Sequence, residues 1–276
     1  MQPVHCLING KPAHTLSVLD RSVQYGDGCF ETIRIHNGQL ILGDPHIARL
    51  QRTCERLGIA IEFAVLQAEI ERLLSLEPNG ILKIIISRGA GGRGYRPSMQ
   101  ANPTRIVQIF PIQENLQHRQ GIIAKLCKHR LAEQLDVAGL KHLNRLDQVL
   151  ASVELHADDV EGICCDQRGN VIEGTRSNII LFHDQVALTP DLSRCGVRGV
   201  MLDYLLQRFT ANGTHCEEKE ISVEELLACD EWLVCNSVFG VWPVNKLHGH
   251  ATVTQWSTGP LTQQALQYQD EIFPRA

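Results

Sequence analysis

The chain has 276 residues, a length that predicts one large domain or two modest ones with a substantial hydrophobic core. Its 43% hydrophobic and 21% charged residues are typical of globular proteins and exclude bulk disorder. A formal net charge of −5 argues against nucleic acid or an anionic membrane as a partner.

The first segment of the chain predicts short strands closed by tight turns. Strand-like residues 4–8 and 30–35 are followed by Asn9-Gly10 and Asn37-Gly38, dipeptides that favour hairpin turns. Two further apolar runs predict buried strands at residues 81–87 and 104–110.

A helix is predicted between these strands, with Asp44 as N-cap, Pro45 at the first helical position and Gly58 at the end. Its buried stripe consists of apolar residues three and four apart, namely Ile47, Leu50, Cys54 and Leu57. This spacing places Arg49 near the flank of the stripe. A second helical pattern covers residues 66–74.

A polar stretch without periodicity divides the sequence. We expect a smaller N-terminal α/β domain at residues 1–112, a linker at 113–121 and a larger C-terminal domain at 122–276. The second half predicts strands at 121–127, 162–165, 171–172, 179–182, 186–188 and 231–235, helices at 146–157 and 200–209, and a capping box at Ser222–Glu225. Helices and hairpins mixed in both halves favour an α+β or mixed α/β fold.

Neither a membrane span nor a secretory signal is expected. No uncharged apolar stretch approaches the roughly 20 residues that cross a bilayer, and the N-terminus lacks a basic segment followed by an apolar run. The ten cysteines are scattered and include no Cys-x-x-Cys pair. We therefore expect reduced thiols and a cytoplasmic location.

Residues 89–94 match the pattern G-x-G-x-x-G after an apolar strand. A dinucleotide site also needs a helix after the glycines, and Pro97 with the polar residues beyond it opposes that helix. A mobile loop fits better, in which Arg88, Arg93 and Arg96 could hold carboxylates through paired hydrogen bonds. A solvated basic loop without a ligand is the alternative.

Local motifs do not identify the reaction that the protein catalyses. His248-Gly-His250 is only a weak metal pattern, so we expect no metal, and a G-x-S-x-G nucleophile motif is absent. Lys141, flanked by Leu140 and Leu143, is a candidate amine nucleophile if partial desolvation lowers its pKa. From the residues alone, an ordinary exposed lysine is the alternative.

Several segments together resemble the fold-type IV pyridoxal-phosphate family, which includes branched-chain and D-amino-acid aminotransferases and aminodeoxychorismate lyases. The matching segments are Asp20-Arg21, Tyr25–Glu31, His46–Leu50, Gly139–Asn144, Glu173–Asn178, Gly196–Arg198, Asn236-Ser237 and Pro243-Val244. They occur in the family's order and cover nearly the whole chain, which implies a two-domain architecture. Residues 86–95 and 141–145 are similar to the lyase branch in particular.

The resemblance implies a role for each matching residue. Lys141, in the larger domain, is similar to the lysine that forms a Schiff base with pyridoxal 5'-phosphate, and Glu173 to the carboxylate that faces the pyridine nitrogen. Arg49 is similar to the phosphate-binding arginine. The remaining implied cofactor contacts are Asn178, Asn236, Ser237 and the backbone N–H groups of Val197 and Arg198.

The lyase branch implies a reaction in folate biosynthesis, the conversion of 4-amino-4-deoxychorismate to 4-aminobenzoate and pyruvate. Lys141 would remove and return a proton at the amine-bearing carbon. The substrate carries two carboxylates, which we expect Arg88, Arg93 and Tyr95 to bind. The resemblance also implies a homodimer.

Two other functions remain open at this point. An aminotransferase of the same fold would need a keto-acid acceptor, and a non-enzymatic dinucleotide-binding module would depend on the glycine pattern at residues 89–94. If the purified protein is colourless and takes up no pyridoxal phosphate, both the lyase and the aminotransferase are excluded.

Overall fold

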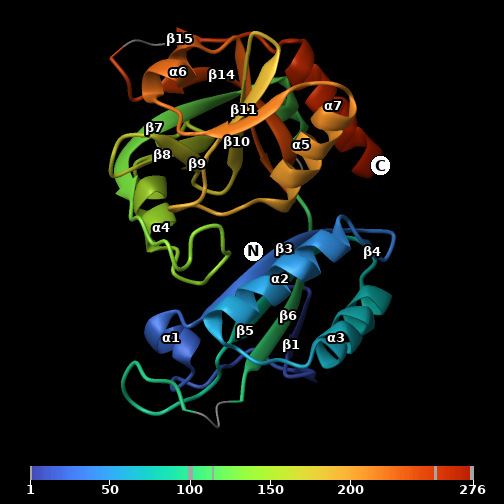
Figure 1. Ribbon diagram of the computed structural model, residues 1–276. Coiled ribbons are helices and arrows are strands. Elements are labelled where there is room, and N and C mark those ends of the chain that lie inside the picture. Colours follow the sequence, from blue (N-terminus) through green and yellow to red (C-terminus); the bar gives the residue numbers. More distant parts are fainter. Residues whose placement is uncertain (1, 99–101, 114, 252–253, 274–276) are drawn as a thin grey trace. The chain divides into compact units, whose positions relative to one another are not determined.

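The structure is a computed structural model that describes residues 2–98, 102–113, 115–251 and 254–273. The chain divides into two compact units (Figure 1). The smaller unit comprises Met1–Gln113 with Leu140–Asn144, and the larger unit comprises Glu114–Gly139 with Arg145–Ala276. Each unit contains both helices and sheet, so the mixed α+β class predicted from the sequence is confirmed.

The smaller unit is built on a six-stranded antiparallel sheet with the order β2-β1-β6-β5-β3-β4. Its strands are β1 (His5–Ile8), β2 (Lys11–Pro12), β3 (Gly28–His36), β4 (Gln39–Leu40), β5 (Gly80–Ser87) and β6 (Thr104–Phe110). Asn9-Gly10 and Asn37-Gly38 have positive φ angles at both positions, as two-residue hairpin turns require. The two predicted turns are therefore confirmed.

The smaller unit also contains helices α1 (Arg21–Tyr25), α2 (Gly43–Leu57) and α3 (Phe63–Leu76). Helices α2 and α3 cover one face of the sheet (Figure 1), where Leu50 and Ile70 join a core that includes Ile84. The predicted N-cap of α2 was wrong, because the helix begins at Gly43 after Leu42. Asp44 instead lies in the first turn, where its charge favours the positive end of the helix.

The larger unit contains a nine-stranded mixed sheet. Its order is β12-β11-β10-β13-β14-β7-β8-β9, and β15 pairs with β14. The strands are β7 (Ile122–Leu131), β8 (Glu161–Asp166), β9 (Val171–Gly174), β10 (Asn178–His183), β11 (Val186–Pro190), β12 (Cys216–Lys219), β13 (Glu231–Asn236), β14 (Gly240–His248) and β15 (Thr254–Gln255). The pairs β11 with β12, β14 with β7 and β7 with β8 are parallel, whereas the other pairs are antiparallel.

The helices of the larger unit are η1 (Leu116–Gln120, a 3-10 helix), α4 (Leu146–Val153), α5 (Val200–Ala211), α6 (Val223–Ala228) and α7 (Pro260–Ile272). The capping box of Ser222 and Glu225 is present at the start of α6, as predicted. Helix α4 ends at Val153, before its predicted limit at residue 157, and the carboxylate of the next residue, Glu154, accepts the N–H groups of Lys128 and His129 on β7. The segment 113–121, predicted to be a linker, contains η1.

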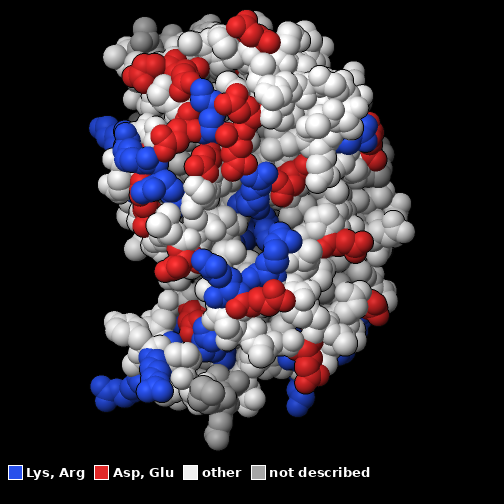
Figure 2. All heavy atoms as spheres, in the orientation of Figure 1, with Lys and Arg blue, Asp and Glu red and all other residues white. Residues whose placement is uncertain are grey.

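The distribution of surface charge and the state of the cysteines agree with what the composition predicts. Acidic and basic side chains lie beside one another on the left of the visible face of the larger unit (Figure 2). Among the ion pairs of this unit, Arg168 pairs with Glu133 and Glu220. All ten cysteines are free thiols, as predicted. Among the helices of the described ranges, none combines the length and the apolar character needed to cross a bilayer.

Candidate active site

Lys141 lies on a short segment that runs along β3. The Phe30 N–H donates to the Lys141 carbonyl at 3.0 Å, and the Leu143 N–H donates to the Gly28 carbonyl at 2.9 Å. These two bonds explain why residues 140–144 belong to the smaller unit, whereas the sequence-based division placed Lys141 in the larger domain. A Cβ at Gly28 would lie 2.3 Å from the Ile86 carbonyl oxygen, so only glycine fits at this point.

The Lys141 amine is half-buried beside an aromatic ring. Its Nζ lies 4.5 Å from the centroid of the Phe30 ring, whose face attracts a cation. On the following residues of the segment, the Asn144 amide donates to the Gly26 carbonyl at 3.1 Å. The segment is thus fixed at both ends, which holds the backbone of the lysine in one place.

Arg49 belongs to a buried ionic cluster rather than to the flank of its helix. Its Nε and Nη2 each donate to a Glu31 carboxylate oxygen at 2.7 Å, and His46 Nδ1 lies 2.7 Å from Glu31 Oε2. All three side chains are buried. Although burial favours the neutral acid, Arg49 and His46 lower the pKa of Glu31 to about 2. The carboxylate therefore fixes the orientation of a charged guanidinium.

His46 is a neutral member of this cluster. Burial lowers its pKa, although the ionised Glu31 opposes this change. A neutral ring beside a carboxylate carries its proton on Nδ1, so Nε2 is an acceptor. Within the described ranges this buried Nε2 has no hydrogen-bond partner. It is a polar atom to which a ligand could donate.

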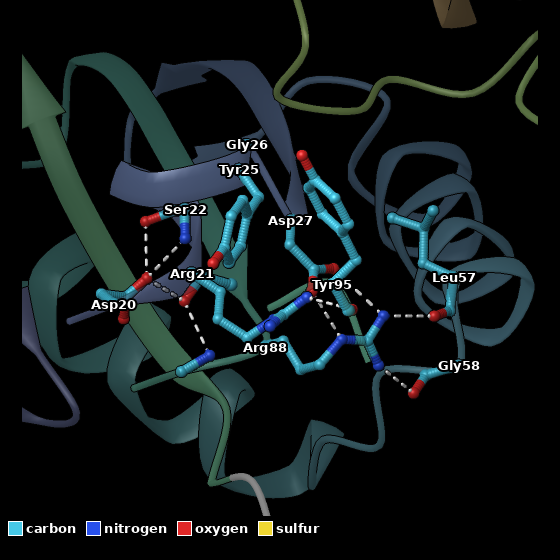
Figure 3. Close-up of polar contacts among 12 residues, drawn as sticks. Asp20, Arg21, Ser22, Tyr25, Gly26, Asp27, Leu57, Gly58, Arg88 and Tyr95 are labelled. Atoms are coloured by element: carbon cyan, nitrogen blue, oxygen red, sulfur yellow. Dashed lines mark hydrogen bonds and ion pairs between the residues drawn. The ribbon is translucent and has the colours of Figure 1, made fainter. Parts of the chain in front are cut away.

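Arg88 is held by protein groups (Figure 3). It donates from Nε and Nη2 to the two oxygens of Asp27, and from Nη2 and Nη1 to the carbonyls of Leu57 and Gly58, all within 3.0 Å. Four of the five N–H groups of a guanidinium are engaged in this way. Arg88 thus joins the end of β5 to the end of α2, and its contact with the substrate stays a prediction.

The rest of the glycine-rich loop is open to solvent. Arg93 is exposed, and Tyr95 is 86% exposed. No helix forms over residues 89–98, which removes the geometry that a dinucleotide site would need. Among the three residues predicted to bind the substrate, Arg93 and Tyr95 are therefore the two that solvent can reach freely.

Glu173 lies near the end of β9 in the larger unit, where two N–H groups bind its carboxylate. Oε1 accepts from the Gln148 side chain at 3.0 Å, and Oε2 accepts from the Val197 backbone at 2.8 Å. Sequence reasoning missed Gln148, which lies on α4 seven residues after Lys141. The two donors stabilise the ionised carboxylate, the form needed opposite a protonated ring nitrogen.

The two predicted phosphate donors have protein acceptors in this structure. Val197 N–H donates to Glu173, and Arg198 N–H donates to the Gly139 carbonyl at 3.0 Å. The Arg198 side chain is also engaged, because its guanidinium pairs with Asp203 and Glu218. Both residues precede helix α5, which begins at Val200 rather than at these positions.

Of the other predicted cofactor contacts, Asn178 begins β10 and Asn236 ends β13, and Ser237 lies on the turn that follows β13. The Asn178 amide donates to the Val197 carbonyl at 2.8 Å. The Asn236 side chain accepts the N–H groups of Val238 and Phe239 and donates to the Arg176 carbonyl. Ser237 is half-buried on the same turn. The larger unit thus brings Glu173, Asn178 and Val197 into direct contact, whereas Asn236 contacts the turn between β9 and β10.

A buried carboxylate that the sequence did not single out organises this turn. Glu161 is fully buried and accepts hydrogen bonds from the Thr175 N–H and hydroxyl, the Ser177 hydroxyl and the Gly162 N–H. Thr175 and Ser177 lie between Glu173 and Asn178, so these bonds determine where both side chains leave the backbone. A lone buried glutamate in a strand carries no sequence signal that distinguishes it from other strand residues.

Each unit, taken by itself, contains residues of the kinds that bind pyridoxal 5'-phosphate. The smaller unit supplies a half-buried amine on Lys141 and a charged guanidinium on Arg49, and the larger unit supplies the Glu173 carboxylate. Buried polar atoms without a partner among the described residues, His46 Nε2 and Gln148 Oε1, lie next to these groups. An amine, a cation and a carboxylate match the aldehyde, the phosphate and the ring nitrogen of this cofactor.

Comparison with known proteins agrees with the residue types found in the candidate site. The model of the family "Amino-transferase class IV" matches residues 28–247. The aminodeoxychorismate lyase of Vibrio harveyi is 34% identical over 93% of this chain and 96% of its own length, and the D-alanine aminotransferase of Bacillus licheniformis is 30% identical over 91% and 90%. The crystal structure of the 4-amino-4-deoxychorismate lyase from Pseudomonas aeruginosa is similar with a TM-score of 0.92 and 40% identity, covering 96% of this chain and 98% of that one. The chain therefore belongs to the class IV aminotransferase family.

Proposed function

We propose that this protein is a pyridoxal-phosphate-dependent lyase that converts 4-amino-4-deoxychorismate to 4-aminobenzoate and pyruvate, a step of folate biosynthesis. The observation that carries the proposal is the likeness to the Pseudomonas aeruginosa lyase, at 40% identity over nearly the full length of both chains. The similarity of residues 86–95 and 141–145 to this branch of the family agrees with it.

Lys141 is the central residue of the proposed reaction. When bound, pyridoxal phosphate supplies an electron sink that stabilises negative charge on the amine-bearing carbon of the substrate. We expect Lys141 to hold the cofactor covalently, and its Nζ to remove the proton from that carbon and later return it. Glu173, which accepts hydrogen bonds from Gln148 and the Val197 backbone, would meet the pyridine nitrogen.

The phosphate would be bound by Arg49, which Glu31 orients through two hydrogen bonds. Asn178, Asn236, Ser237 and the backbone of Val197 and Arg198 remain proposed contacts. For Val197 this role requires a change of hydrogen-bond acceptor from Glu173 to the phosphate, because its N–H donates to Glu173 in this structure. Arg93 and Tyr95 are the groups that we propose for the carboxylates of the substrate, since both are exposed.

An aminotransferase acting on D-amino or branched-chain acids is the second candidate, because the Bacillus licheniformis D-alanine aminotransferase is 30% identical over 91% of this chain. One product assay separates the two functions. The lyase forms 4-aminobenzoate and pyruvate without any added keto acid, whereas the aminotransferase exchanges amino groups only when a keto acid is present.

We also propose a cytoplasmic homodimer. Ten free thiols agree with a reducing compartment. Helix α4 exposes an apolar stripe at helical spacing, formed by Leu146, Val149, Leu150 and Val153, each 46–78% exposed. A contiguous stripe of this kind is typical of a protein interface. We propose that a second copy of the chain covers it.

A further inference from the structure

The base of the glycine-rich loop is bonded to the residues that begin helix α1. The Arg21 N–H donates to the Gly89 carbonyl at 3.0 Å, and the Gly91 N–H donates to the Leu19 carbonyl at 3.3 Å. A Cβ on Gly91 would lie 3.1 Å from Cδ of Arg21, so the loop packs directly on the arginine stem. The loop therefore leaves the sheet along a fixed path.

The guanidinium of Arg21 binds the far end of the same loop (Figure 3). Nη1 donates to the Gly94 carbonyl at 3.0 Å and Nη2 donates to the Tyr95 carbonyl at 2.8 Å. Nε donates to Asp27 at 2.7 Å, and the side chain is only 5% exposed. One buried side chain thus holds two consecutive carbonyls next to Arg93.

Two neighbours fix the guanidinium in this position. Its Cζ lies 4.8 Å from the Tyr25 ring centroid, and the Tyr25 hydroxyl accepts the Gly94 N–H at 3.2 Å. Asp27 is shared with Arg88, and although burial opposes ionisation, the two guanidinium groups lower the pKa of Asp27. The counter-ion is therefore charged at neutral pH, and turning Arg21 away would break its ion pair with Asp27 and leave that carboxylate with Arg88 as its partner.

We propose that Arg21 is a positioning residue for the substrate: by holding the Gly94 and Tyr95 carbonyls, it presents Arg93 and Tyr95 in a preformed arrangement. The inference rests on the proposed function, in which these two side chains bind the carboxylates. A loop fixed before binding loses less conformational entropy when the substrate arrives, so the clamp lowers KM. Lysine cannot replace this arginine, because one ammonium does not reach two carbonyls and a carboxylate in the geometry of a planar fork.

The test combines proteolysis with kinetics on the cofactor-loaded full-length protein. Arg93-Gly94 is an exposed trypsin site, and we expect Arg21→Lys and Arg21→Ala to speed its cleavage about tenfold, the factor set by losing one net hydrogen bond. The same variants should raise KM for 4-amino-4-deoxychorismate about tenfold, with kcat changed by less than about threefold and the cofactor spectrum unaltered. Arg72→Ala, which removes an exposed arginine–carbonyl bond to Gly10, is the matched control.

Each outcome bears on the proposal. Unchanged cleavage at Arg93 in both variants would refute the clamp, and faster cleavage with unchanged KM would refute the positioning role. If the wild type makes no 4-aminobenzoate, the proposed function fails, while the cleavage rates still test the clamp. Should the Arg21 variants fail to fold, Tyr25→Phe removes only the acceptor of the Gly94 N–H and should shift both quantities by about threefold.

Discussion

Replacing Glu31 by glutamine removes the charge that binds Arg49 and His46 in the smaller unit. All three side chains are buried, and the carboxylate accepts three hydrogen bonds of 2.7 Å. Glutamine has nearly the same shape but offers a single acceptor oxygen and no charge. The guanidinium of Arg49 would then stay buried beside a neutral amide.

The size of the expected loss of stability follows from the pKa of Glu31. Burial opposes ionisation, yet Arg49 and His46 lower the pKa of Glu31 from 4.5 to about 2. That difference corresponds to about 3 kcal/mol of stabilisation of the charged form. Breaking a buried ion pair usually costs about 3–5 kcal/mol, a range that agrees with this value. We therefore expect Glu31→Gln to lower the free energy of unfolding by about 3 kcal/mol at pH 7.

Urea denaturation followed by far-ultraviolet circular dichroism measures this loss, with the exposed Glu55→Gln on α2, the helix that carries His46 and Arg49, as the control. The pH dependence gives a second readout. Between pH 4.5 and about 2 the unfolded chain binds a proton on Glu31 that the folded chain does not, so wild-type stability falls as the pH falls through this window. A loss below about 1 kcal/mol, or an unchanged acid profile in the variant, would refute the reasoning.

Four further changes test the proposed site and assembly. Lys141→Ala should give a colourless protein with less than about 1% of wild-type activity, measured by visible absorbance and by turnover. Glu173→Gln should lower kcat at least about tenfold. Gln148→Leu, which removes one of the two donors to that carboxylate, should weaken cofactor binding about tenfold in a titration, and an unchanged affinity would contradict its role. Val149→Lys should convert a dimer to a monomer in sedimentation, whereas the exposed Gln207→Lys on α5 should not; a monomeric wild type would contradict the dimer.

Much of the fold was predictable because its signals are local. The hairpin turns at Asn9-Gly10 and Asn37-Gly38 need residues that tolerate positive φ angles, and the capping box at Ser222 needs only two side chains three residues apart. The N-cap of α2 was missed. The chain enters this helix at Leu42 with a positive φ angle, a conformation that leucine rarely adopts and that the sequence therefore does not indicate.

The candidate site was predictable through resemblance and not through spacing. Lys141 and Glu173 stand out only as parts of longer motifs, and their contacts depend on residues distant in sequence. Gln148 and Glu161 act through hydrogen bonds to other side chains or to the backbone, which no local pattern encodes. Arg49 illustrates the same limit: helical spacing put it on a flank, but pairing with Glu31 on β3 allows it to be buried.

The central claim is that the chain is a lyase of the class IV aminotransferase family. The most direct test incubates the purified, cofactor-loaded protein with 4-amino-4-deoxychorismate in the absence of any keto acid and quantifies both products. We predict 4-aminobenzoate and pyruvate in equal amounts, formed catalytically and abolished by Lys141→Ala. A protein that forms neither product yet transfers amino groups from D-alanine to a keto acid would contradict the lyase function.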